Sequence, residues 1–235
     1  MPAYEEADNL RVLLPHLRQV ASSLASSSEI LVIDAETPRD DTPAVCEKNK
    51  VRYIPRTGGS QYGDAIRTAL KKATGKYVVL MDADGSHDPG FLAQLWEFRE
   101  QYDVVIASRY VRGGRTDNPV ILIFLSLVVN VAFRMVLNLN CRDVSNSFRL
   151  YQGHQFRALR LNCSNFDIVE EILIKLNPGD QSLRIKEVPF TFQKRKEGKT
   201  KRDLVSFALT YIATLYRLYR IKHMAKASLK KRGAE

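Results

Sequence analysis

Two carboxylates separated by a single residue follow a short apolar run. Asp82-Ala83-Asp84 comes directly after Val78-Val79-Leu80-Met81. Mg²⁺ and Mn²⁺ prefer oxygen ligands and keep places for substrate phosphates, so such a site needs few protein carboxylates. We expect Asp84 to bind the cation directly and Asp82 to orient the site. A solvated acidic turn would show the same spacing, but the position after a buried strand favours a functional site.

A cluster of cations lies far along the chain from this acidic pair. Residues 194–202 hold six Lys or Arg residues around Gly198. Arginine forks match phosphate oxygens, lysine supplies a point charge, and glycine lets the backbone approach a ligand closely. Arg195 and Lys201 are therefore candidates to hold phosphate, although an exposed basic hairpin tip would look similar. Together the two clusters suit a diphosphate-linked donor, held through a metal on one side and by cations on the other.

The composition limits the classes of protein that fit. A chain of 235 residues, 45% hydrophobic and 26% charged, can form one sizeable globular domain. The net charge of +10 favours polyanions or an anionic bilayer as partners. We expect no nucleic-acid partner, because no motif combines basic with aromatic residues for base stacking. The three cysteines are far apart and the four histidines are scattered, which fits a reducing cytosol and predicts neither a disulfide framework nor a histidine metal cluster.

Short apolar runs alternate with segments of helical spacing over the first 110 residues. This alternation predicts a doubly wound α/β unit. Ligands of such sheets bind beyond the carboxyl ends of the strands, so Asp34, Asp82 and Arg109 should converge. Asp88 before a proline is expected to cap a helix. The predicted strands are residues 29–34, 51–54, 77–81 and 103–108, and the predicted helices are residues 6–25, 63–73 and 89–101.

The pattern changes after residue 118. The apolar stretch 120–133 is too short to span a bilayer and predicts a core helix or an interfacial one. A helix at 167–176 and a strand at 183–192 follow. Residues 203–224 predict an amphipathic helix, so we expect one domain over 1–202 and a basic appendage over 203–235. The appendage would meet anionic lipid or would instead be solvated or form oligomers. The cations expected to face lipid are Lys222, Lys226, Lys230, Lys231 and Arg232.

Five motifs occur in a fixed order along most of the chain. They are PAYEEADNL at 2–10, GKYVVLMDADGSHDP at 75–89, SRYVRGG at 108–114, DVSNSFR at 143–149, and EVP at 187–189 followed by RKEGKTK at 195–201. In this order they resemble glycosyltransferase family 2, and within it the dolichyl-phosphate mannosyltransferases and related polyprenyl-phosphate glycosyltransferases. Each motif alone is weak evidence, whereas the ordered set is strong.

The resemblance implies a fold, a reaction and a set of partners. The fold would be of the GT-A type, a Rossmann-like, mostly parallel central sheet flanked by helices. The reaction would move a sugar from a nucleotide-diphosphate sugar, GDP-mannose or a UDP-sugar, to a polyprenyl or dolichyl phosphate with inversion. Mg²⁺ or Mn²⁺ would be the cofactor. The protein would be cytoplasmic and peripheral, in contact with the cytoplasmic face of a membrane.

The resemblance also implies roles for residues of this chain. Those framing the nucleotide would be Pro2, Tyr4, Glu6, Val32 and Asp34, with Asp82 and Ala83 touching it. Those at the metal would be Asp84, Asp82 and Ser86. Those meeting the donor diphosphate or acceptor phosphate would be Arg109, Arg195 and Lys201. Those lining the acceptor side would be Asp143 and Arg149.

Several positions depart from the family pattern. Asp34-Ala35-Glu36-Thr37 replaces the usual Asp-Asp-Gly-Ser, Gln61-Tyr62-Gly63 replaces Gly-Leu-Gly, and Ser86 stands where glutamine often binds the metal. Only Met1 precedes Pro2, so a first strand should be nearly absent. Two alternatives therefore stay open. One is a soluble family 2 enzyme with a glycan or other hydroxyl acceptor, for which Asp143 would be the base. The other is a non-catalytic nucleotide-binding relative.

Overall fold

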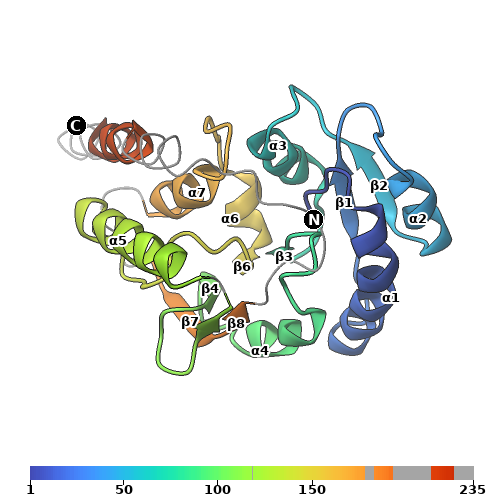
Figure 1. Cartoon of the computed structure of the whole chain (residues 1–235), viewed down its shortest axis with the longest axis horizontal. Coiled ribbons are helices and arrows are strands. Elements are labelled where there is room, and N and C mark those ends of the chain that lie inside the picture. Colours follow the sequence, from blue (N-terminus) through green and yellow to red (C-terminus); the bar gives the residue numbers. More distant parts are fainter. Residues whose placement is uncertain (118, 178–182, 193–212, 225–235) are drawn as a thin grey trace.

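A four-stranded sheet lies at the centre of the fold (Figure 1). The computed structural model describes residues 1–117, 119–177, 183–192 and 213–224. The sheet order is β3-β6-β4-β7, with β3 at Tyr77–Leu80, β6 at Arg149–Gln152, β4 at Val104–Ser108 and β7 at Ile185–Pro189. Two smaller parallel pairs are β1 (Leu31–Asp34) with β2 (Arg52–Pro55), and β5 (Arg115–Thr116) with β8 (Thr191–Phe192).

Strand β6 was not predicted, and it changes the expected topology. It pairs antiparallel with both β3 and β4, whereas β4 and β7 are parallel. A strand from beyond residue 118 therefore completes the sheet, and the first 110 residues are not a self-contained doubly wound unit. The α/β architecture with parallel-rich sheets is confirmed, and β6 is its antiparallel member.

Helices pack against both faces of the sheet because side chains alternate along each strand. In β4, Val105 and Ala107 join the core formed with α1 (Ala7–Leu24) and α4 (Leu92–Glu97). Val104 and Ile106 join the second core, formed with α7 (Ile168–Leu176). The remaining described helices are α2 (Thr42–Lys48), α3 (Tyr62–Lys72), α5 (Val120–Val136), α6 (Gly153–Arg157), a 3-10 turn at Pro89–Phe91, and residues 213–224.

The residues before α1 run beside β1. Pro2 bridges to Ile33 in the parallel sense, and the Ala3 amide donates to the Ile33 carbonyl at 2.9 Å. The Ile33 amide in turn donates to the Met1 carbonyl at 2.8 Å. The PAYE segment is thereby fixed next to the carboxyl end of β1.

Helix α5 carries many of its apolar side chains on the outside. Phe124 is 60% exposed and Met135 is 73% exposed, whereas Asn130 and Phe133 are buried. The helix therefore contributes one face to the core and leaves the other face exposed. None of the helices within the described ranges combines the length and the hydropathy that a membrane crossing requires.

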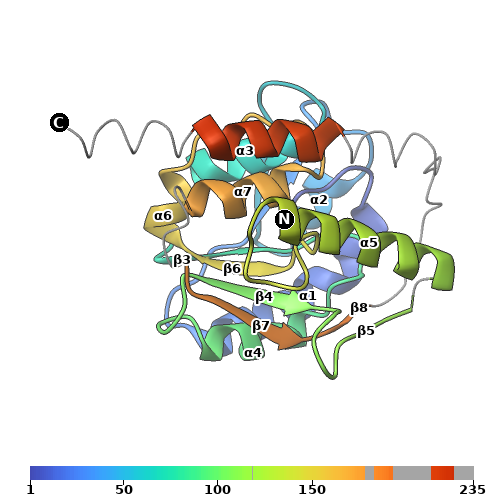
Figure 2. The same ribbon diagram turned by 90° about the vertical axis from the view of Figure 1, so that its left-hand side faces the viewer.

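The C-terminal helix, residues 213–224, lies on the same side of the molecule as α5, the side that faces the viewer in Figure 2. Leu218 is fully buried in the second core. Lys222 is also buried and donates from Nζ to the Leu137 carbonyl at 2.6 Å. The expectation that Lys222 faces lipid is therefore wrong. The other predicted lipid-facing cations and residues 203–212 lie outside the described residues.

Candidate active site

The first carboxylate of the acidic turn is held by two hydroxyl groups. The Tyr62 hydroxyl, at the start of α3, donates to Asp82 Oδ1 at 3.1 Å, and the Ser147 hydroxyl donates to Asp82 Oδ2 at 2.8 Å. Burial raises the pKa of Tyr62 well above its usual value, so the phenol remains a donor. Tyr62, a position where the sequence departs from the pattern of the family it resembles, thus supplies an orienting group for Asp82.

The second carboxylate is oriented from within its own turn. Asp84 is nearly buried, and its Oδ1 accepts hydrogen bonds from the Ser86 amide at 3.1 Å and the Ser86 hydroxyl at 2.5 Å. Gly85 between them has a φ of 77°, a conformation that glycine adopts without strain. Ser86, predicted to stand at the metal, thus touches Asp84 directly. Asp88 caps the following 3-10 turn as expected, since its Oδ1 accepts from the Gly90 amide at 3.0 Å.

The carboxylate oxygens of Asp82 and Asp84 suit a hard cation that also binds substrate. Within the described part of the chain, no three or more His, Cys, Asp or Glu side chains gather into a group that could enclose a metal. Mg²⁺ characteristically uses one or two carboxylates and completes its shell with water and phosphate oxygens. Asp84, with Asp82 beside it, fits that requirement.

His87 links the acidic turn to the rest of the site. Its ring is buried, and its Nδ1 accepts a hydrogen bond from the Asp82 amide at 3.0 Å. Burial is the main cause that lowers the His87 pKa, while the charges of Asp82 and Asp84 raise it and that of Arg109 lowers it. The His87 imidazole therefore interacts electrostatically with the acidic turn after β3 and with Arg109 after β4.

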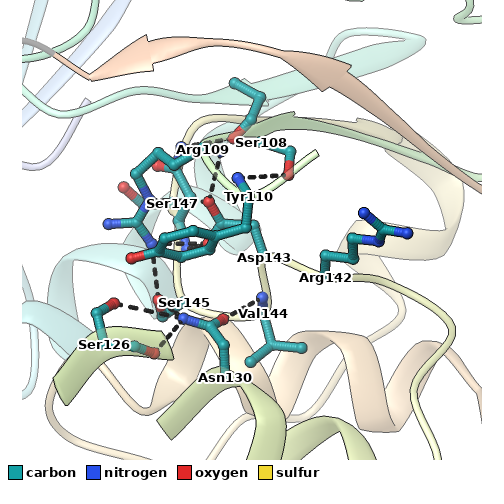
Figure 3. Close-up of polar contacts among 12 residues, drawn as sticks. Ser108, Arg109, Tyr110, Ser126, Asn130, Arg142, Asp143, Val144, Ser145 and Ser147 are labelled. Atoms are coloured by element: carbon teal, nitrogen blue, oxygen red, sulfur yellow. Dashed lines mark hydrogen bonds and ion pairs between the residues drawn. The ribbon is translucent and has the colours of Figure 1, made fainter. Parts of the chain in front are cut away.

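Arg109 is fixed by a buried carboxylate (Figure 3). Its Nε and Nη2 donate to the two oxygens of Asp143 at 2.8 and 2.7 Å, and its amide donates to Asp143 Oδ2 at 2.9 Å. Asp143 is fully buried, and although burial alone would raise its pKa, the Arg109 charge and hydrogen bonds hold that pKa below its usual value. Arg109 Nη2 also donates to the Ser145 hydroxyl at 2.8 Å. Asp143 therefore positions Arg109 and is poorly suited to act as a base.

Helix α5 is tied to the same network (Figure 3). The Asn130 side chain donates to the Ser145 hydroxyl at 3.2 Å and accepts from the Val144 amide at 2.7 Å. It also donates to the Ser126 carbonyl one turn back, at 2.8 Å. Asn130 on the inner face of α5 thus holds the loop that carries Asp143, while the outer face is apolar.

Glu187 is a positioning residue that sequence reasoning did not assign. Its Oε1 accepts from the Ser108 hydroxyl at 2.7 Å and from the Asp143 amide at 2.9 Å. Its Oε2 accepts from the Arg142 amide at 2.7 Å. Glu187 belongs to the EVP motif in β7, and a charged residue inside a predicted strand was the available signal.

Three of the residues predicted to contact ligand have side chains buried in the interior, at Val32, Ala83 and Arg149. Arg149 is fully buried and donates to the carbonyls of Val169 at 3.0 Å and Val144 at 2.6 Å. In this structure it supports the 143–149 loop from inside and does not line a surface. The Val32 side chain is likewise buried in the core. Beside Arg149, burial raises the pKa of Glu170 to about 7.

The residues predicted to frame the nucleotide gather around the end of β1. Asp34 is buried; its Oδ2 accepts from the Tyr53 hydroxyl at 3.4 Å, and its Oδ1 has no hydrogen-bond partner among the described residues. Burial raises the Asp34 pKa. Tyr4 is exposed with the Arg39 guanidinium 5.3 Å from its ring centre, and Glu6 accepts from the Asn9 side chain at 2.6 Å. This Asp34 oxygen is therefore a buried acceptor at the end of β1. Arg195 and Lys201 lie outside the described residues.

Sequence comparison decides the family. Residues 1–159 match the profile of Glycosyl transferase family 2. The chain belongs to this family. It is 30% identical over 227 residues to the dolichol-phosphate mannosyltransferase of Pyrococcus furiosus, covering 93% of this chain and 62% of that protein. It is 31% identical over 217 residues to the undecaprenyl-phosphate mannosyltransferase of Micrococcus luteus, covering 86% and 85% of the two chains. The chain thus spans less than two thirds of the length of the Pyrococcus relative.

Solved structures of another sugar-transferring enzyme show the same fold. Glucosyl-3-phosphoglycerate synthase from Mycobacterium tuberculosis, in complex with Mn²⁺ and UDP-glucose, superposes with a TM-score of 0.66. Its sequence is 18% identical, and the match covers 92% of this chain and 76% of that one. The same enzyme with Mg²⁺ and UDP gives a TM-score of 0.68. The central sheet and its flanking helices are thus confirmed as a GT-A type arrangement.

Proposed function

We propose that this glycosyltransferase moves a mannosyl group from a nucleotide-diphosphate sugar to a polyprenyl phosphate. The observation that carries the proposal is that helix α5 joins the polar site with one face and exposes apolar side chains on the other. Its Asn130 joins the network that fixes Arg109, and its opposite face presents exposed apolar side chains. An acceptor with a phosphate head and an isoprenoid tail matches both surfaces. The names of the Pyrococcus and Micrococcus relatives support the same acceptor and sugar.

The donor would bind at the acidic turn. Asp84 and Asp82 would hold Mg²⁺ or Mn²⁺ together with the diphosphate oxygens, as oxygen ligands of this kind suit these ions. When bound, the cation would neutralise charge that develops on the departing diphosphate. Asp34 and the Tyr4 segment would contact the nucleoside. The Mycobacterium tuberculosis structures with Mn²⁺ or Mg²⁺ and UDP support a divalent ion in this fold.

The acceptor chemistry needs no strong base. A phosphate monoester is already an anion at neutral pH, so one of its oxygens can attack the anomeric carbon directly. The new bond forms from that oxygen to the sugar while the bond to the nucleoside diphosphate breaks, with inversion. Arg109 would hold the attacking phosphate beside the donor against charge repulsion. A hydroxyl acceptor would need a base, and Asp143 is bound by Arg109 with a lowered pKa.

A transfer assay tests this function. The purified protein with Mn²⁺ and a mannosyl nucleotide such as GDP-mannose should convert a short polyprenyl phosphate into a lipid-phospho-mannose, and should leave the corresponding polyprenol unchanged. A thermal-shift series with GDP and UDP would identify the base, because ligands that bind the folded form raise its melting temperature. Transfer to the alcohol but not to the phosphate would support the hydroxyl-acceptor alternative. Nucleotide binding without any transfer would support a non-catalytic relative.

We also propose that the side carrying α5 rests peripherally on the cytoplasmic face of a membrane. The apolar outer residues of α5 recur at helical spacing, at Ile121, Phe124, Val128, Val131 and Met135. The C-terminal helix lies on the same side (Figure 2). It exposes Tyr216, Tyr219 and Met224 together with cations. Exposed apolar, aromatic and basic side chains in this combination suit a bilayer interface. The three cysteines are buried and unpaired, which suits a reducing compartment.

Membrane binding should depend on the outer face of α5. In flotation with phosphatidylcholine–phosphatidylglycerol vesicles, Phe124→Ser with Val128→Ser should lower partitioning at least about tenfold, since each buried apolar side chain contributes about 1.5–3 kcal/mol. The control is Val12→Ser on α1, where the valine is 69% exposed. Point substitutions are preferable to truncation after residue 202, because truncation would also remove Leu218 from the core. Equal flotation of all three proteins would contradict this placement.

A further inference from the structure

Phe192 and His87 bring together the two halves of the site. The ring of Phe192, in β8, meets the His87 ring edge-on, with centroids 5.8 Å apart and planes at 79°. The Arg109 guanidinium lies 5.7 Å from the centre of the same phenyl ring. Aromatic rings attract cations over their faces and meet other rings in T-shaped contacts, and Phe192 makes a contact of each kind.

His87 transmits this contact to the acidic turn. Its Nδ1 accepts from the Asp82 amide at 3.0 Å, at the first residue after Met81. Its ring stacks on Phe148 with centroids 4.8 Å apart and planes at 14°, and it meets Phe190 edge-on at 6.0 Å. The imidazole is buried, so this set of contacts restricts its rotation. A shift of Phe192 would therefore press on His87 and, through it, on the backbone that carries Asp82.

We propose that Phe192 and His87 are positioning residues that keep Arg109 in register with the Asp82–Asp84 turn. The inference rests on the proposed function, because Arg109 is the group that would hold the attacking phosphate and the turn would hold the donor. Neither residue needs to touch substrate. Transfer between two bound phosphates depends on their separation, and a displacement of about 1 Å can cost on the order of a hundredfold in rate. The aromatic pair fixes that separation from beneath the site.

Phe192→Leu tests the contact between Phe192 and Arg109. Leucine keeps an apolar side chain but removes the ring face, so turnover in the transfer assay should fall about tenfold while the KM for the nucleotide sugar stays within about twofold. Phe192→Tyr, which keeps the ring, should retain turnover. The matched control is Phe98→Leu. Phe98 is also half-buried, meets Tyr102 edge-on at 6.1 Å, and has Lys186 Nζ 4.6 Å from its ring centre.

His87→Leu tests the nucleotide-binding side of the site, in a measurement that needs no lipid phosphate. It leaves the Asp82 amide without its acceptor, so the Kd of GDP or UDP in the presence of Mn²⁺ should rise about tenfold, in line with losing a hydrogen bond to a buried donor. His87→Asn, whose Oδ1 can accept the same hydrogen, should restore binding.

Turnover of the Phe192 variants and nucleotide affinity of the His87 variants distinguish a failure of the proposed function from a failure of this inference. If the natural protein binds Mn²⁺ and nucleotide but transfers to no lipid phosphate, the proposed function fails, and the His87 variants still test the pairing. Unchanged turnover in Phe192→Leu together with unchanged nucleotide affinity in His87→Leu would overturn the inference. Equal losses in Phe98→Leu and Phe192→Leu would do the same, because they would indicate a general loss of packing.

Discussion

Asp84→Asn should lower sugar-transfer turnover by a factor on the order of 10²–10³, as expected when one preorganised charge-stabilising group is lost. Asparagine has nearly the same size and can still accept a hydrogen bond from Ser86, so the turn should keep its shape. What disappears is the negative charge that would hold the cation. The Mn²⁺-dependent part of the nucleotide thermal shift should disappear with it, while the melting temperature without ligand stays close to that of the natural protein.

Asp88→Asn is the matched control for this substitution. Asp88 lies in the same loop, is exposed, and caps the 3-10 turn by accepting from the Gly90 amide at 3.0 Å. Asparagine is an equally good cap, so turnover and metal dependence should be retained. If Asp84→Asn keeps full Mn²⁺-dependent transfer, the assignment of Asp84 to the metal is wrong. If Asp88→Asn loses as much activity as Asp84→Asn, the effect belongs to the loop and not to the charge.

The elements with strong local periodicity were predictable from sequence. The spacing of Leu10, Leu13, Leu14 and Leu17 indicates α1, and the apolar runs that end at Asp34 and Asp82 indicate β1 and β3. The short helices α2 and α6 were missed because seven and five residues are too few for a periodic pattern to emerge. The prediction for Lys222 was wrong because its position on the packed face of the last helix depends on tertiary contact.

Strand β6 and Arg149 depend on tertiary contacts that local sequence patterns cannot predict. Arg-Leu-Tyr-Gln has a cation at one end and an amide at the other, so it does not look like a central strand. Arg149 can be buried there because the carbonyls of Val144 and Val169 accept its hydrogen bonds, and these acceptors come from a loop and from α7. Likewise, motif order predicts that Arg109 and Asp143 are both functional, but only the fold shows that they bind each other. Pairing of residues 34 positions apart depends on the folded structure and not on local sequence.

Asp143→Asn should be among the most destabilising substitutions in the site. The carboxylate is fully buried and accepts from the Arg109 side chain and amide, and from the Asn146 amide at 3.1 Å. Removing one partner of a buried ion pair leaves the other charge uncompensated and costs about 3–5 kcal/mol. For a chain of this size, that corresponds to a fall in melting temperature of roughly 10–15 °C. Transfer should also fall at temperatures where the variant is folded, because Arg109 loses its orientation.

The pH dependence gives this prediction a second signature. Because the folded-state pKa of Asp143 is lowered, its contribution to stability is present above the unfolded value of about 3.9 and is lost as the pH falls through the folded pKa. The gap in melting temperature between the natural protein and Asp143→Asn should therefore be widest near neutral pH and should narrow below about pH 4.

Asp103→Asn tests whether burial or ion pairing is the cause of the loss of stability expected for Asp143→Asn. Asp103 also receives an arginine fork, with Arg184 Nε at 3.2 Å and Nη2 at 3.1 Å, and it accepts from the Arg184 amide at 2.9 Å. The Arg184 side chain, however, is 59% exposed. Water can solvate that guanidinium when its partner is lost, so the melting temperature should change little. Equal losses in the two variants would show that the Arg109–Asp143 pair is not special to the site, and the argument that Asp143 builds a fixed phosphate-binding arginine would lose its physical basis.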